Sequence, residues 1–115
     1  MTLRGNPVQR YFFVTTQDPF TNSSANDYFI HITKLSQQGN GVSVFLVQNG
    51  ITPAIKNAHL PCFDELLASA ITIYADIFSL QQRGIKATEL KQNIQSTDLH
   101  AIIHARLNGD DVIWF

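Results

Sequence analysis

Residues 42–47, Val-Ser-Val-Phe-Leu-Val, form a short run that is apolar on both of its faces. A strand of this kind has to be covered on both sides, which is typical of the middle of a parallel sheet. Similar β-favouring runs occur at residues 11–15 and 71–75, and another closes the chain at residues 112–115. Because these runs alternate with helical segments, the sequence predicts parallel βαβ units with right-handed crossovers and helices on both faces.

The first helical segment follows the turn-like residues 16–24. From Ala25 onward its apolar residues recur at helical spacing, a residue among 22–24 can serve as the N-cap, and Gly39 ends the segment. After the second strand, residues 51–61 contain two prolines and predict a loop or a broken helix.

Three further helical segments complete the pattern. Short helices are predicted at residues 63–69 and 77–83, with Gly84 as the C-cap of the second, and a turn of helix at residues 88–92. The last helix is predicted to begin after Ser96 or Thr97 as N-cap and to end at Asn108-Gly109. Its apolar residues are expected to share one face, and they are Leu99, Ile102, Ile103 and Leu107.

Length and composition predict a single domain over residues 1–115, since 44% hydrophobic and 15% charged residues suffice for one core. The formal net charge of -1 argues against nucleic acid and membrane surfaces as partners. The first ten residues lack the apolar stretch of a signal peptide, and no apolar run approaches the roughly 20 residues that span a bilayer. A soluble, cytoplasmic protein is therefore expected, and the single cysteine, Cys62, which cannot form an internal disulfide, agrees with a reducing compartment without demanding one.

The order of these motifs resembles the DsrE/DsrF-like family, which includes small subunits of bacterial sulfur-relay complexes. The resemblance covers nearly the whole chain, and its segments are a strand leading into Thr15-Thr-Gln-Asp-Pro19, a helix ending at Gly39, residues 44–51, Arg83-Gly84-Ile85 and residues 111–115. It implies a three-layer α/β/α sandwich with a mostly parallel sheet of about five strands. It also implies a homotrimer or homohexamer, with a sulfur-relay protein or a small molecule as a further partner. No residue pattern indicates a cofactor.

Asp76 follows the third predicted strand, at the edge where open α/β sheets bind ligands. In sulfur-carrying members that the chain resembles, a persulfide cysteine lies eight positions before the glycine of the Arg-Gly pair. Counting back from Gly84 gives Asp76. A carboxylate oxygen cannot attack and release sulfur as a thiolate does, so sulfur transfer through Asp76 is excluded.

Ligand binding is the functional role expected for Asp76, with Gln17, Asn49 and Gly50 lining the same cleft. Proton transfer is disfavoured, because a helix N-terminus stabilises the carboxylate anion and lowers its pKa. The alternative is a structural N-cap for the helix that follows. Arg83 could bind an anion near this cleft, although neutralising the carbonyls at its own helix end is the favoured reading.

Cys62 provides the chain's single thiol and lies near a possible helix start, where a thiolate would be stabilised. It could therefore be a sulfur carrier, with His59 lowering its pKa if the loop folds back, or simply a small buried apolar residue. His100 and His104 have the spacing of two metal ligands on one helix, but they lack a third ligand nearby. No metal site is predicted.

Two functions from different classes follow. The preferred one is a non-catalytic DsrE-like oligomer that binds a small molecule or a sulfur-relay partner at a pocket near Asp76. The alternative is a sulfurtransferase or sulfur carrier that uses Cys62, and a purely structural subunit is a third possibility.

Eight Phe, three Tyr and one Trp are many aromatic rings for so small a domain to bury alone. Some of them are therefore predicted to line a subunit interface.

Overall fold

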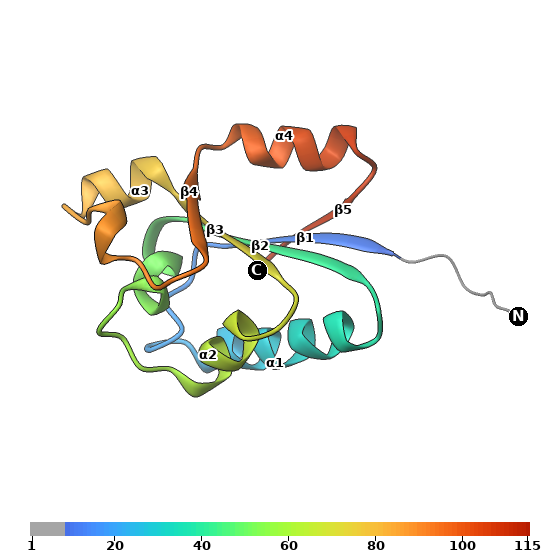
Figure 1. Cartoon of the computed structure of the whole chain (residues 1–115), viewed down its shortest axis with the longest axis horizontal. Helices are drawn as coiled ribbons and strands as arrows, with labels where there is room; N and C mark the ends of the chain where they lie inside the picture. The colour runs from blue at the N-terminus through green and yellow to red at the C-terminus, as the bar shows by residue number, and fades with distance from the viewer. Residues whose placement is uncertain (1–8) are drawn as a thin grey trace, which may run out of the picture.

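A single five-stranded sheet organises the computed structural model, which describes residues 9–115 (Figure 1). The strand order is β4-β3-β2-β1-β5, and every neighbouring pair is parallel. The predicted α/β fold is confirmed, and the sheet is wholly rather than mostly parallel. The strands are β1 (Arg10–Thr15), β2 (Gly41–Leu46), β3 (Thr72–Asp76), β4 (Ile94–Thr97) and β5 (Asp111–Trp114).

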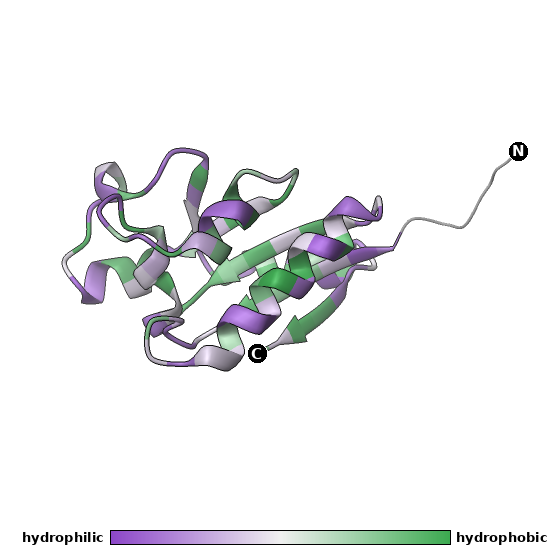
Figure 2. Ribbon diagram, turned by 90° about the horizontal axis from the view of Figure 1, so that it is seen from below, coloured by the Kyte–Doolittle hydropathy of each residue, from purple (hydrophilic) through white to green (hydrophobic). Residues whose placement is uncertain are grey.

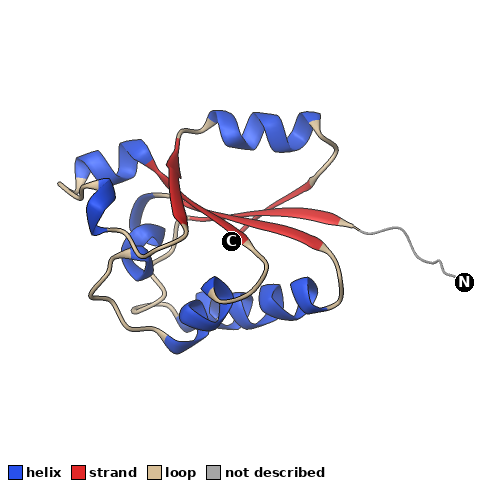
Figure 3. Cartoon of the chain, in the orientation of Figure 1, coloured by secondary structure: helices blue, strands red, loops and turns tan. Residues whose placement is uncertain are grey.

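Helices cover both faces of this sheet, as the sequence predicts (Figures 1 and 3). The helices α1 (Ser23–Gln37) and α2 (Pro61–Leu67) lie together on one face, and α4 (His100–Leu107) lies across the other. A short helix, α3 (Ile77–Gln82), continues directly from β3. Two 3-10 helices complete the described part of the chain, η1 (Gln48–Ala54), which overlaps the start of the predicted broken segment, and η2 (Ala87–Glu89).

The two faces of the sheet carry separate apolar clusters, because successive strand residues point to opposite sides. On one side, sheet residues such as Val44 and Ile73 pack with Phe29 of α1 and Phe63 of α2. On the other side, a smaller cluster of Phe12, Val14, Phe45 and Val47 packs with Ala105 of α4. Figure 2 shows the central strands coloured mainly as hydrophobic, with hydrophilic residues on the outer parts of the helices.

The fourth strand, β4, corrects the sequence analysis. Ser96 and Thr97 were expected to cap the last helix, but both belong to β4, which pairs with β3 at the sheet edge. The helix begins at His100, whose backbone N–H donates to the side chain of Asp98. β4 reads Ile-Gln-Ser-Thr and is partly exposed, so it lacks the continuous apolar run by which the other strands are recognised.

The apolar face expected on the last helix is present for three of its four residues, but the domain does not bury it. Leu99, Ile103 and Leu107 follow one another at four-residue spacing and are all exposed, Leu107 to 78%. The helix instead faces the sheet with its smaller residues, of which Ala105 is buried, while Ile102 packs partly against the same cluster. Helical spacing therefore identifies a shared apolar face without showing whether the domain itself covers that face.

The remaining helical segments lie close to their predicted positions. Asn22 is the N-cap of α1, and its side chain accepts a hydrogen bond from the backbone N–H of Ser24. α2 begins two residues before its predicted start, because Pro61 fits the first turn of a helix, where its missing N–H costs nothing. Gly84 has a positive φ of 65° after α3, which suits glycine at a helix end.

The described part of the chain does not include residues 1–8. Most of the first ten residues, for which no signal peptide is predicted, therefore lie outside it. Within residues 9–115, no helix is long and apolar enough to cross a membrane.

Candidate functional site

Asp76 is the last residue of β3. Its neighbour Ala75 is buried on the face that α1 and α2 cover, and because successive strand residues point to opposite faces, Asp76 points to the face that α4 covers. Its Oδ2 accepts two hydrogen bonds from Ser79, one from the backbone N–H at 3.0 Å and one from the hydroxyl at 2.6 Å. The same hydroxyl oxygen accepts a hydrogen bond from the backbone N–H of Gln48 at 2.7 Å. Asp76 is therefore the N-cap of α3 and, through Ser79, is linked to the start of η1.

The other carboxyl oxygen of Asp76 is not paired in this way. The residue is 3% exposed, and no group among residues 9–115 donates a hydrogen bond to Oδ1. Buried polar atoms without a partner are rare in folded proteins, because each forfeits the hydrogen bonds that it makes with water. Capping α3 thus accounts for one oxygen of Asp76 and leaves the other without a structural role.

A pocket of about 280 Å³ lies beside Asp76. Three of its lining side chains are apolar, and Phe78 at the start of α3 is 64% exposed. The opposite wall comes from the connection between β4 and α4. This connection lies next to Asp76 because Thr97, the last residue of β4, pairs with Asp76 in the sheet. The lining residues are Asp76, Phe78, Asp98, Leu99, His100 and Ile103.

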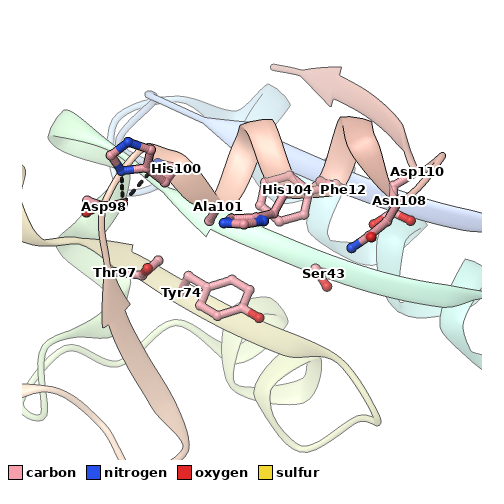
Figure 4. A pocket seen from close by; sticks show the side chains of 11 residues that line it. Phe12, Ser43, Tyr74, Thr97, Asp98, His100, Ala101, His104, Asn108 and Asp110 are labelled. Carbon is pink, nitrogen blue, oxygen red and sulfur yellow. Dashed lines mark hydrogen bonds and ion pairs between the residues drawn. The ribbon is translucent and has the colours of Figure 1, made fainter.

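A larger hollow of about 670 Å³ lies between α4 and the sheet and shares Asp98 and His100 with the pocket beside Asp76 (Figure 4). Asp98 Oδ1 accepts the backbone N–H of His100 at 3.0 Å and lies 3.0 Å from Nδ1 of its ring. These contacts, the backbone hydrogen bond first, lower the pKa of Asp98 below its ordinary value. A carboxylate therefore lies where the two hollows meet.

The other predicted binding residues lie elsewhere along the carboxyl ends of the strands. Gln17 accepts a hydrogen bond from the side chain of Asn22 at 2.6 Å, near the start of α1. Gly50 lies so close to β1 that a Cβ there would come within 2.5 Å of the carbonyl oxygen of Thr15. Of the described residues, those that line the pocket beside Asp76 do not include Gln17, Asn49 or Gly50.

Asn49 and Arg83 form a contact that bears on the site indirectly. One guanidinium nitrogen of Arg83 donates to Asn49 Oδ1 at 2.8 Å, and another donates to the carbonyl oxygen of Ser79 at 3.2 Å. Arg83 thus binds a carbonyl of its own helix, as favoured from the sequence. The contact also ties η1 to α3 and so supports the Asp76–Ser79–Gln48 hydrogen bonds.

Cys62 lies at the start of α2, on the sheet face opposite to Asp76. Its thiol donates to the side-chain oxygen of Asn26 at 2.9 Å. Burial is the largest cause that raises the pKa of the Cys62 thiol above its ordinary value, and the charges of Asp64 and Asp27 act in the same direction. His59 lies 3.5 Å from Asp64 and pairs with that carboxylate.

His100 and His104 both line the hollow under α4. Within the described chain, no three His, Cys, Asp or Glu side chains are grouped so that they could hold a metal ion. The two histidines are therefore part of the wall of the hollow.

Several site residues were missed from the sequence, and they include Tyr74, Phe78 and Asp98. Asp98 and Leu99 were missed because β4, whose carboxyl end brings them beside Asp76, was not recognised, whereas Tyr74 and Phe78 lie on a predicted strand and a predicted helix and carry no sequence signal of a binding role. Because parallel strands end at one edge, recognising β4 would have added the residues after it to the site.

These features define a small parallel α/β protein with a ligand-sized pocket at the carboxyl ends of its strands. The DsrE/DsrF-like family model matches residues 9–115, and the chain belongs to this family. The YchN protein of E. coli shares the fold with a TM-score of 0.83 at 17% identity, over 94% of this chain and 100% of that one. MTH1491 of Methanobacterium thermoautotrophicum, a protein of unknown function, has a TM-score of 0.79 at 13% identity, over 95% and 100%. No curated protein matches the chain.

Proposed function

We propose that this protein is an oligomeric, non-catalytic DsrE-like protein that binds a small molecule or a sulfur-relay partner at the pocket beside Asp76. Membership of the DsrE/DsrF-like family supports a link to sulfur relay. The observation that carries the proposal is the buried Asp76 Oδ1, which has no donor among residues 9–115 although the side chain lines a pocket. A ligand with an N–H or O–H group would supply the missing hydrogen bond.

The same residue argues against sulfur transfer at this position. The family resemblance aligns Asp76 with the persulfide cysteine of sulfur-carrying members, and a carboxyl oxygen cannot form or release a persulfide. Asp76 also holds α3 in place through Ser79, so the position keeps a structural role in this chain. The scaffold and the pocket are thus retained without the thiol.

Oligomerisation is supported by exposed apolar residues on opposite sides of the domain. One group lies on α3 and α4, and we call it the α3–α4 patch; its members are Phe78, Leu99, Ile103 and Leu107. On the other side, Tyr28 and Ile30 of α1 are exposed, at positions two residues apart that point in different directions from the helix. A gathered apolar surface such as the α3–α4 patch marks a protein interface, and a second contact through α1 would allow a trimer to assemble further into a hexamer.

Native mass spectrometry of the purified full chain tests the proposal directly. We expect a trimer or hexamer in which each copy retains a small molecule. The variant Asp76→Asn keeps the size of the side chain but places an N–H₂ or a neutral oxygen at the pocket, and we expect it to lose the molecule. Cys62→Ser is the matched control on the opposite face and should retain it.

Two outcomes would contradict the binding role. A wild-type oligomer without added mass would argue against a tightly held small molecule. Retention of the molecule by Asp76→Asn would show that Asp76 does not bind it and has only a capping role.

The alternative function, a sulfur carrier that uses Cys62, is favoured by one observation. Cys62 lies at the beginning of α2, where backbone N–H groups lower the pKa of a thiol. Burial outweighs this effect and raises the pKa overall. We therefore prefer the non-catalytic function.

Alkylation kinetics distinguish the two functions. Because its pKa is raised, Cys62 has less thiolate at pH 8 than an ordinary cysteine, so we expect iodoacetamide to react at least about threefold more slowly with the folded chain than with the urea-unfolded chain. The rate should increase as the pH rises toward the thiol pKa. A folded-state rate faster than that of the unfolded chain, or cyanide-labile sulfur that disappears in Cys62→Ser, would favour the sulfur carrier.

A further inference from the structure

The hollow under α4 follows from the topology of the sheet. β4 and β5 lie at opposite edges, so the connection between them has to cross the whole face of the sheet. α4 makes this crossing, over the face of the sheet opposite to α1 and α2 (Figure 1). It approaches the sheet with Ala101 and Ala105, whose side chains are too small to fill the space over β2 and β3. About 670 Å³ is left open, within the roughly 300–1,000 Å³ range of small-molecule sites.

Aromatic rings lie at the floor of the hollow. Phe12 of β1 and Tyr74 of β3 lie nearly parallel, with centroids 6.3 Å apart and an interplanar angle of 28°. Phe45 of β2 lies edge-on to both rings and fixes their orientation. Figure 4 shows Phe12 and Tyr74 beneath α4, with the ring of His104 pointing from the helix toward the sheet. A planar ring can therefore stack between the floor and His104.

The rim of the hollow is polar and rich in hydrogen-bond acceptors. Asp98 lies at one end, where the contacts with His100 keep it ionised. Asp110 lies at the other end and is paired with Arg10, whose Nε is 3.0 Å from Asp110 Oδ1. None of the residues that line the hollow is Lys or Arg, and Arg10 is already committed to Asp110 and to the carbonyl of Asn108. This charge distribution disfavours an anionic ligand.

We propose that the hollow under α4 binds an uncharged planar heteroaromatic molecule that carries amino or hydroxyl donors, of the nucleoside type. The ring stacks over Tyr74 beneath His104, and the donors reach Asp98 at the open end. A phosphate group on the same molecule opposes binding, because it brings negative charge next to Asp98 without a cation to receive it. This site adjoins the pocket beside Asp76, with which it shares Asp98 and His100, but Asp76 does not line it and the proposal does not depend on the function proposed for that pocket.

Equilibrium dialysis of the full chain with labelled adenosine tests the proposal. We expect a Kd of about 1 mM or tighter, and at least threefold weaker binding of adenosine 5′-monophosphate. Ala101→Phe places a ring in the hollow from the helix side, and Tyr74→Leu removes the stacking surface from the sheet side. We expect at least tenfold weaker adenosine binding for each. His31→Ala, which changes an exposed residue of α1 on the opposite face, should bind as the parent does.

Three results would overturn the proposal. They are no retention of adenosine at several millimolar by the folded parent chain, tighter binding of the monophosphate than of adenosine, and unchanged adenosine binding by Ala101→Phe. Circular dichroism of each variant shows whether it is folded. Because one variant adds volume on the helix and the other removes it from the sheet, misfolding of one leaves the other as a test. Asp76→Asn should bind adenosine normally, which separates this site from the one beside Asp76.

Discussion

Replacing Ile103 with aspartate is expected to convert the oligomer into folded monomers. Ile103 is 54% exposed on α4 and lies between Leu99 and Leu107 in the α3–α4 patch. In the monomer a charge at such a position meets water, so the folded domain should lose no more than about 0.5 kcal/mol. In an interface the carboxylate would be buried without a partner, at a cost of at least about 3 kcal/mol, which is more than a hundredfold in the association constant.

Size-exclusion chromatography with light scattering measures this effect, and urea unfolding confirms that the variant is folded. Gln92→Asp is the matched control, because it places the same charge on an exposed position in the turn before β4, outside both the α3–α4 patch and α1. We expect it to keep the parental mass. An Ile103→Asp protein that keeps the parental mass would show that the α3–α4 patch is not a subunit interface, and the α1 side would then be the remaining candidate.

The second large effect is expected for Asp76→Ala, which removes the N-cap of α3. The substitution deletes both hydrogen bonds that Ser79 donates to Oδ2 and frees the hydroxyl that orients Gln48. We expect a loss of about 1–2 kcal/mol in the free energy of unfolding, the usual cost of losing a capping side chain. Asp76→Asn retains an acceptor oxygen of the same reach, and asparagine caps helices about as well as aspartate, so its cost should be no more than about 0.5 kcal/mol.

Urea denaturation at constant pH compares the two variants. The Asn variant isolates the charge, because its geometry is close to that of the parent, whereas the Ala variant removes charge and hydrogen bonds together. If Asn is as destabilising as Ala, then the charge of Asp76, and not its hydrogen bonds to Ser79, stabilises the start of α3. We expect Asp76→Asn to keep the stability of the parent in urea but to lose the bound molecule in the native mass measurement, so this one variant separates the capping role of Asp76 from its binding role.

The sequence predicted the strands that are rich in apolar residues and missed β4, which is not. β1, β2 and β3 are recognised because both of their faces contact the core, so their apolar residues are continuous. β4 is an edge strand with exposed Gln95 and Ser96, and its stability comes from backbone pairing with β3. Backbone pairing leaves no mark on side-chain pattern, so β4 is not visible to hydrophobic periodicity.

Of the residues around the candidate site, the sequence placed Asp76 at the end of β3 but did not identify the residues that lie opposite to it. Asp76 lies at the end of β3 beside a pocket, because a strand followed at once by a capped helix fixes its place in the chain and in the sheet. The residues opposite to it were not predicted, since Asp98 and Leu99 are brought there by the pairing of β4 with β3. The hollow under α4 likewise arises from the distance between the edge strands, which depends on strand order.

By itself, the sequence determined the class of fold, the alternation of strands and helices, and the carboxyl group at the end of the third strand. These properties are local, because periodicity, capping and turn residues act over a few positions along the chain. The tertiary structure alone decided which faces remain exposed, that Cys62 and Asp76 lie on opposite sides of the sheet, and which hollows form. Those outcomes depend on contacts between segments far apart in sequence, and no short stretch of residues encodes them.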